Sequence, residues 1–129
     1  MLVEFAFVMP ILALLVLIII DGGLAIREYQ LLQNAAREAA RFGSLRSETT
    51  VSEITDRVVN YCAEERIPVD PAEVTVVKDS PFPVEGGTLN AYGTLVTVTR
   101  SHQMLLLGAP ILPSGNITLT GRSLFRNLY

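Results

Sequence analysis

The chain has 129 residues, of which half are apolar and 18% are charged, and its formal net charge is −3. A chain of this length holds one domain, or one small domain with an appendage. The negative charge and the low aromatic content of 7% exclude a nucleic-acid binder held by bulk positive charge. A single cysteine and a single histidine exclude an internal disulfide and metal frameworks that need several of either residue. We therefore expect no enzyme, no cofactor and no metal site.

The apolar residues gather at the N-terminus, where only Glu4, Pro10, Asp21, Gly22 and Gly23 interrupt the first 26 positions. About 25 such residues in a helix can cross hydrocarbon about 30 Å thick. A buried core helix and a cleavable secretory signal are the alternatives, but the first rarely shows an apolar surface all round. The second lacks a basic segment before the apolar run. The pattern favours a helix buried in a membrane or in a membrane-like protein environment.

The residues that follow, up to Phe42, are strong helix formers without glycine or proline. Apolar and small residues recur there at spacings of three and four, which predicts a covered helix face. That predicted face comprises Ile26, Tyr29, Leu32, Ala36, Ala39, Ala40 and Gly43. A continuous helix from Leu2 to Phe42 would be about 60 Å long. We expect three segments: an apolar helix over 1–26, its amphipathic continuation over 27–43, and a globular domain over 44–129.

A second helix is predicted from the capping-box pattern that starts at Thr50 and has Glu53 three residues later. Its apolar face contains Ile54, Val58, Tyr61 and Cys62, and Pro68 follows its expected end near Arg66. Cys62 is interpreted as a small buried hydrophobic residue instead of a reactive thiol. A nucleophilic pair of Cys62 with His102 lacks supporting motifs, and Asp70, Glu73 and Asp79 are too scattered to indicate paired acid and base.

Three later segments alternate with a period of two and are rich in β-branched residues: 73–78, 94–100 and 116–125. The segments expected to lie between these strands are 80–83 with Gly86-Gly87, and 102–113. The second contains a glycine and two prolines, so it is expected to be a loop or a packed extended segment and not a strand. The second of these is also apolar, so it is either a contact surface or part of the core. The predicted fold class is α+β: a long N-terminal helix packed on a second helix and a three- to four-stranded antiparallel sheet.

Two motifs resemble those of the TadE-like pilins, relatives of type IV pilins in the tight-adherence system. They are VEFAFVMP at Val3–Pro10 and NAAREAARFG at Asn34–Gly43. Later strand and loop segments also look similar, so the likeness extends over nearly the whole chain. Such pilins are made with a short basic leader that a membrane peptidase removes. Met1 is therefore either the first residue after processing or the initiator methionine, and the second case would weaken the resemblance. Without a leader, the arginines after the apolar run would place the domain in the cytoplasm; a basic leader would reverse that orientation.

The resemblance implies a structural subunit of an extracellular pilus for surface attachment. Its partners would be copies of itself or related pilins, the inner membrane before assembly, the pilus assembly machinery and the prepilin peptidase. The alternative is a membrane-anchored accessory or minor priming protein that does not form the filament shaft. The residues expected to act in assembly are Met1, Glu4, Pro10, Gly22 and Gly23.

Among these residues, Glu4 is the one for which we make the most specific prediction, which concerns the partner of its carboxylate. No lysine or arginine precedes Arg27, so the nearest cation to its carboxylate is an α-amino group at Met1. That amine belongs either to the same chain or, as the resemblance implies, to an adjacent subunit. Pro10 favours a bend in the helix. Two glycines at 22–23 weaken the helix, and they act either as a hinge or as a site of close packing.

Overall fold

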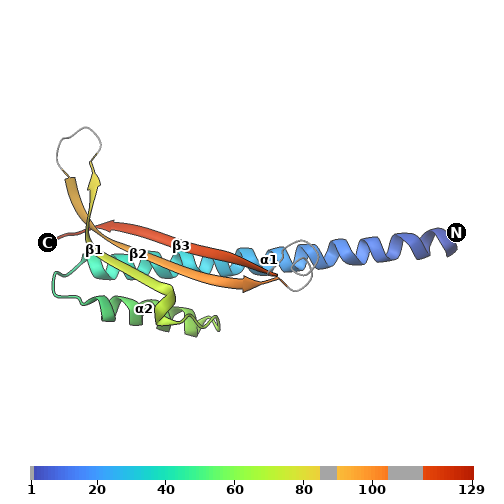
Figure 1. Cartoon of the computed structure of the whole chain (residues 1–129), viewed down its shortest axis with the longest axis horizontal. Coiled ribbons are helices and arrows are strands. Elements are labelled where there is room, and N and C mark those ends of the chain that lie inside the picture. Colours follow the sequence, from blue (N-terminus) through green and yellow to red (C-terminus); the bar gives the residue numbers. More distant parts are fainter. Residues whose placement is uncertain (1, 85–89, 105–114) are drawn as a thin grey trace. The chain divides into compact units, whose positions relative to one another are not determined.

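The computed structural model describes residues 2–84, 90–104 and 115–129. Along the chain these form α1 (Leu2–Ser44), α2 (Val51–Glu64), the short 3-10 helix η1 (Pro71–Glu73), β1 (Val74–Pro83), β2 (Asn90–Gln103) and β3 (Asn116–Arg126) (Figure 1). The chain divides into two compact units. One contains Met1–Arg27 and Ser101–Thr118, and the other contains Glu28–Arg100 and Leu119–Tyr129. The predicted fold class is confirmed: a long apolar N-terminal helix, a second helix and a three-stranded antiparallel sheet.

Helix α1 is continuous over 43 residues and passes through Pro10 and the glycine pair without a break. It ends two residues after the predicted end, where the Ser44 hydroxyl donates a hydrogen bond to the Arg41 carbonyl oxygen at 2.8 Å. Gly43 is buried, and a Cβ there would lie 2.6 Å from Cδ1 of Ile54 on α2. Glycine at this position therefore permits the close approach of α2.

Helix α2 begins with the predicted capping box. The Thr50 amide donates to the Glu53 carboxylate at 2.7 Å, and the Glu53 amide donates to the Thr50 hydroxyl at 3.2 Å. These bonds satisfy two backbone donors that a helix N-terminus otherwise leaves without partners. The Thr50 backbone N–H, and then its side chain, hold the pKa of Glu53 below its usual value. The helix ends at Glu64, two residues before the predicted end, and Arg66 adopts a left-handed φ of 62° before Pro68.

The sheet has the order β1-β2-β3, and each strand is longer than predicted. The segment 80–83, expected to lie between two strands, instead continues β1, in which Pro81 pairs with Tyr92 and Pro83 with Asn90. Because β1 is an edge strand, its prolines remove no hydrogen bond from a central ladder. A register shift between Val77 and Ser80 forms a bulge at Asp79, whose φ is 55°. Gly86-Gly87 and the apolar segment 105–113 lie outside the described residues, whereas His102 lies in β2.

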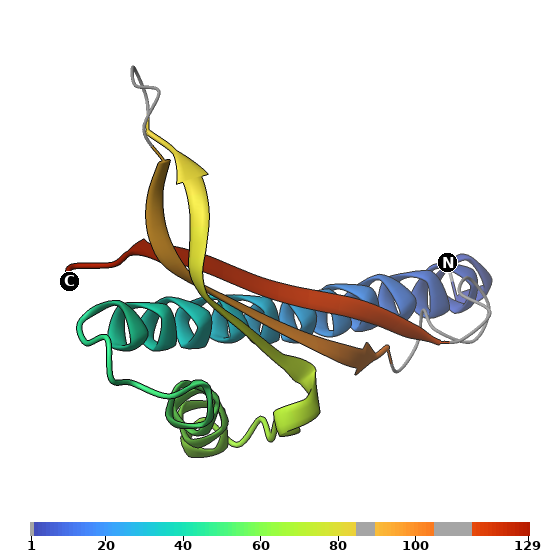
Figure 2. The same ribbon diagram turned by 60° about the vertical axis from the view of Figure 1, so that its left-hand side comes forward.

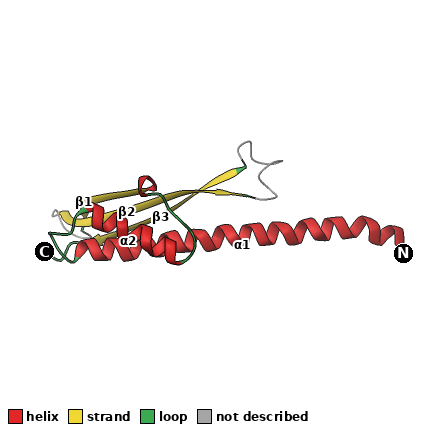
Figure 3. Cartoon of the chain, turned by 90° about the horizontal axis from the view of Figure 1, so that it is seen from below, coloured by secondary structure: helices red, strands yellow, loops and turns green. Residues whose placement is uncertain are grey.

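The core of the second unit joins α1, α2 and β2. It comprises Leu31, Leu32, Ala35, Ala36, Ala39, Ala40, Ile54, Val58, Cys62, Ile67, Val69, Val96 and Val98. Val96 and Val98 are buried while Thr97 and Thr99 are not, so one sheet face is covered, as the alternation predicts. Figure 2 shows α2 beside the C-terminal part of α1, and Figure 3 separates the helices from the strands by colour. Alanines on α1 allow this close packing because their side chains are small.

The prediction that Ile26 and Tyr29 belong to the covered face of the helix is wrong. Ile26 is 60% exposed and Tyr29 is 47% exposed. The covered face instead starts at Ala25 and continues through Leu31, Leu32 and Ala35. Spacings of three and four are compatible with both the predicted face and the observed face. The buried alanines are only weakly hydrophobic, so the sequence pattern did not show which of the two faces is covered. Ile26 and Tyr29 therefore lie on the exposed surface of α1.

Strand β3 lies close to α1 at Gly121. A Cβ on Gly121 would lie 2.4 Å from the backbone carbonyl carbon and oxygen of Leu32. Beside it, the Gln33 side-chain amide donates to the Arg122 carbonyl oxygen at 2.7 Å and accepts from the Arg122 amide at 3.1 Å. The Gln33 amide thus satisfies backbone groups of β3 as a neighbouring strand would, and this shields part of the sheet edge.

Candidate functional site

The first part of α1 exposes almost all of its apolar side chains. An 18-residue window of this helix has a mean hydropathy of 2.9 and no residue buried inside the subunit. By length and composition the helix can cross a membrane. Between Val3 and Ile20 the exposed large side chains include Phe5, Phe7, Ile11 and Ile19, each more than half exposed. A contiguous apolar surface of this extent indicates burial in lipid or against other protein.

The predicted assembly residues lie along this helix and do not converge on one point. Glu4 is in the first turn, Pro10 lies inside the helix, and both are exposed. Gly22 follows Glu4 by 18 residues, which corresponds to about 27 Å along the axis. Met1 lies outside the described residues. The carboxylate of Glu4 also suits a helix N-terminus, where the backbone dipole favours negative charge.

The glycine pair has no packing role within the described part of this chain. A Cβ on Gly22 or on Gly23 would meet no atom within 4 Å, in contrast to Gly43 and Gly121. The need for glycine at 22–23 therefore does not come from a close neighbour among the described residues.

Asp21 was not singled out by the sequence, yet it is only 2% exposed. Aspartate is seldom buried to this degree unless it has partners. Asp21 lies at the end of the long apolar run and directly before the glycine pair. This position was the one sequence feature that could have indicated a special role for Asp21. The buried carboxylate makes this turn of α1 chemically distinct from the exposed apolar turns before it.

Of the residues considered for catalysis, Cys62, Asp70, Glu73 and Asp79 have structural roles. Cys62 is fully buried, and burial raises the pKa of its thiol, which disfavours the nucleophilic thiolate. The carboxylates of Asp70 and Glu73 cap η1. Asp79 accepts hydrogen bonds from Asn127 and Tyr129. Within the ranges described, no three His, Cys, Asp or Glu side chains could together hold a metal ion.

Asn127 and Leu128 form hydrogen bonds that fasten the end of the chain to the sheet and to α1, and the sequence did not indicate these bonds. We call this arrangement the clasp. Asn127 is its centre: the backbone N–H donates to the Tyr92 carbonyl oxygen at 2.9 Å, and the side chain bonds Thr94 at 3.0 Å and Asp79 at 2.6 Å. The next amide, that of Leu128, donates to the Ser44 carbonyl oxygen at 3.0 Å. Asp79 reaches this position because the bulge turns the strand there. The clasp therefore joins β1, β2 and the end of α1.

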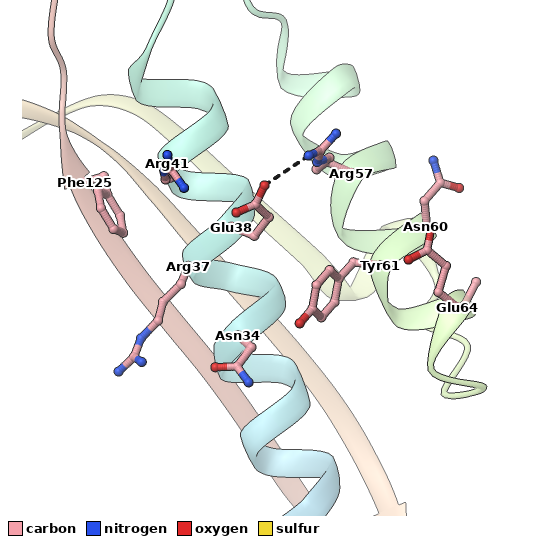
Figure 4. Close-up of a pocket in the computed structure, with 10 residues that line it drawn as sticks. Asn34, Arg37, Glu38, Arg41, Arg57, Asn60, Tyr61, Glu64 and Phe125 are labelled. Atoms are coloured by element: carbon pink, nitrogen blue, oxygen red, sulfur yellow. Dashed lines mark hydrogen bonds and ion pairs between the residues drawn. The ribbon is translucent and has the colours of Figure 1, made fainter.

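A groove over α1 and α2 was also not anticipated. It encloses about 870 Å³ and is lined by Asn34, Arg37, Glu38, Arg41, Arg57, Asn60, Tyr61, Ala63, Glu64 and Phe125. We call it the arginine groove. One ion pair crosses it, from Arg57 to Glu38 at 3.0 Å, and the Arg57 guanidinium also lies 5.3 Å from the ring centre of Phe42 (Figure 4). Asn34, Arg37, Glu38 and Arg41 belong to the NAAREAARFG motif. The other lining residues come from α2 and β3, so no local motif signals the groove as a whole.

Comparison with known proteins relates the first part of the chain to a known family. The sequence model of a family described as TadE-like protein matches residues 1–41. No curated protein and no solved structure matches the chain. The match spans about a third of the chain, covers nearly all of α1 and contains the VEFAFVMP motif. It confirms the resemblance on this helix, while the predicted likeness of the later strands falls outside the matched segment.

Proposed function

We propose that this chain, whose residues 1–41 match the model of the TadE-like protein family, is a structural subunit of an extracellular pilus used for surface attachment. It would be inserted in the inner membrane of a bacterial or archaeal cell before assembly, and would then pack its apolar helix among those of neighbouring subunits. In this role it needs no catalytic site and no cofactor. Its partners are copies of itself or related pilins, with the assembly machinery and the prepilin peptidase acting before incorporation.

The observation that carries this proposal is the contrast between the two parts of α1. From residue 28 onward, α1 contributes to a core that the subunit completes by itself. Before that, large apolar side chains stay exposed from Val3 to Ile20. Burying each of them is worth about 1.5 to 3 kcal/mol. Lipid can supply that burial before assembly, and the helices of neighbouring subunits can supply it in a filament.

Glu4 is proposed to select and align the incoming subunit. A carboxylate at the centre of a membrane helix costs about 2.5 to 3.5 kcal/mol on insertion scales, and less near the helix end. An ammonium group offers the compensation that a carboxylate in apolar surroundings needs. We propose that the Met1 ammonium of an adjacent subunit supplies it, which would fix the axial register between subunits.

Gly22 and Gly23 are proposed to act when the subunit enters the filament. Each glycine lowers helix stability by about 1 kcal/mol relative to alanine. Local loosening of the helix at this point would change the axial spacing between subunits. Regular helical hydrogen bonding from Ile20 to Leu24 in a filament structure would contradict this hinge, and would favour close helix contacts through the glycines.

The second candidate is a membrane-anchored accessory or minor priming pilin-like protein. It would use the same exposed helix and differ only in abundance and position within the filament. Filaments sheared from cells and imaged by electron microscopy, with their protein components quantified by mass spectrometry, separate the two. The shaft proposal expects this chain to be the main component and its deletion to abolish filaments. Trace amounts in an otherwise intact shaft would instead support the accessory role.

A further inference from the structure

The arginine groove concentrates positive charge on an otherwise acidic chain. Three of the ten basic residues line it, together with two of the thirteen acidic residues. The rest of the chain thus has seven basic and eleven acidic residues. The lining residues thus have a formal net charge of +1 and the rest of the chain one of −4, and a local excess of positive charge attracts anionic partners.

Two of the three arginines make no ion pair in the described part of the chain. Glu38 is paired with Arg57, whereas no carboxylate among the described residues lies within 4.0 Å of Arg37 or Arg41. These two are exposed and stand four residues apart on α1, a spacing at which like charges repel and weaken a helix. The pair from Glu38 to Arg57 shows that a carboxylate fits against a guanidinium here.

The other lining residues fit a hydroxylated, ring-containing ligand. Asn34 and Asn60 supply side-chain amides, which both donate and accept hydrogen bonds. Tyr61 and Phe125 supply aromatic surface at the groove. In Figure 4, Arg37 and Arg41 extend from α1, whereas Arg57 extends from α2 toward Glu38. The guanidinium groups are spread along the groove, which suits several separate anionic groups better than one phosphate.

From this arrangement we propose that the arginine groove binds the carboxylate groups of an acidic polysaccharide. Arg37 and Arg41 would bind carboxylates through the planar guanidinium fork. The two asparagines would bind sugar hydroxyls, and the aromatic side chains would contact the sugar rings. This inference goes beyond the proposed function, because binding of this kind requires no filament assembly and can fail while assembly holds.

The test measures binding of the full-length chain in non-ionic detergent by isothermal titration calorimetry. The probes are oligogalacturonate, neutral dextran of similar length, and poly-glutamate of matched charge. The groove variant is Arg37→Gln with Arg41→Gln. The matched control is Arg27→Gln with Arg46→Gln, which removes the same charge at two exposed arginines outside the groove. Near-UV circular dichroism verifies that both variants keep the parent's tertiary structure.

We expect oligogalacturonate to bind in a salt-sensitive manner, and dextran and poly-glutamate to bind at least about tenfold more weakly. A charge-assisted hydrogen bond is worth about 1.5 to 3 kcal/mol, so the groove variant should lose about tenfold or more in affinity. The control should change by less than about twofold. Equal losses in both variants, or no binding by the parent, would overturn the proposal. Equal affinity for poly-glutamate would also overturn it, since it would indicate an acidic peptide, such as a segment of a second copy.

Discussion

Substituting alanine at Gly121 tests whether the contact between β3 and α1 holds the domain together. The added Cβ would lie 2.4 Å from the Leu32 carbonyl carbon and oxygen and 2.7 Å from the Gln33 amide nitrogen. All three are backbone atoms of a helix, so none can rotate away. The strand has to move outward instead, which strains the two hydrogen bonds between Gln33 and Arg122.

The magnitude follows from how such overpacking behaves. An extra methyl group in a well-packed contact costs about 1 to 3 kcal/mol, and the backbone clash places Gly121→Ala in the upper half of that range. For a domain of up to about 100 residues, each kcal/mol lowers Tm by about 4 to 8 °C. We therefore expect Tm to fall by roughly 8 to 24 °C.

Thermal unfolding followed by near-UV circular dichroism is the assay, because all four tyrosines lie in the second compact unit. Gly43→Ala is an intermediate case, since its Cβ would meet the side-chain ends of Ile54 and Thr94. Gly22→Ala is the control, because nothing lies within 4 Å, and it should not lower Tm. A Tm for Gly121→Ala within about 3 °C of the parent would refute the reasoning, as would a larger loss for Gly22→Ala.

Three further outcomes are expected. A fragment of residues 27–129 should be soluble and folded by circular dichroism and gel filtration, since it lacks the exposed apolar helix; an aggregated or unfolded product would contradict the two-part organisation. Because hydrogen bonds lower the pKa of Glu53, its ionised form stabilises the fold above about pH 4.5, and this contribution is lost as the pH falls through the lowered pKa. The stability difference between parent and Glu53→Gln should therefore shrink on acidification, and a difference independent of pH would argue against the capping box. Asn127→Ala removes two side-chain hydrogen bonds from the clasp, so amide exchange at Leu128 should become faster, with unchanged exchange as the refuting result.

The helices were predictable because each has local signals. The all-apolar run and the strong helix formers define α1, and the Thr50–Glu53 capping box starts α2 where the structure has it. The three strands were predicted from the alternation of apolar and polar residues, but the residues at which they begin and end were not. The extension of β1 through Pro81 and Pro83 depends on β1 lying at the sheet edge, and edge position is a tertiary property that prolines in a sequence do not reveal.

The missed features depend on residues that are distant in the sequence. Gln33 and Arg122 are 89 positions apart, and Asp79 and Asn127 are 48 apart. The arginine groove likewise combines two helices and a strand. The covered face of α1 was misplaced at Ile26 and Tyr29 because its true core residues are mostly alanines, whose contribution comes from close packing instead of strong hydrophobicity.

The assembly role of α1 is tested most directly by replacing Glu4 with leucine and measuring the fraction of the protein that enters filaments. Glu48→Leu is the matched control, since it makes the same chemical change at an exposed position between α1 and α2. Sheared filaments and the membrane fraction are quantified from the same cells. We predict that Glu4→Leu reaches the membrane at the parent's level while its filament fraction falls at least about tenfold, and that Glu48→Leu assembles normally. Assembly of Glu4→Leu as efficient as that of the parent would contradict the proposed pairing of Glu4 with the Met1 ammonium of an adjacent subunit.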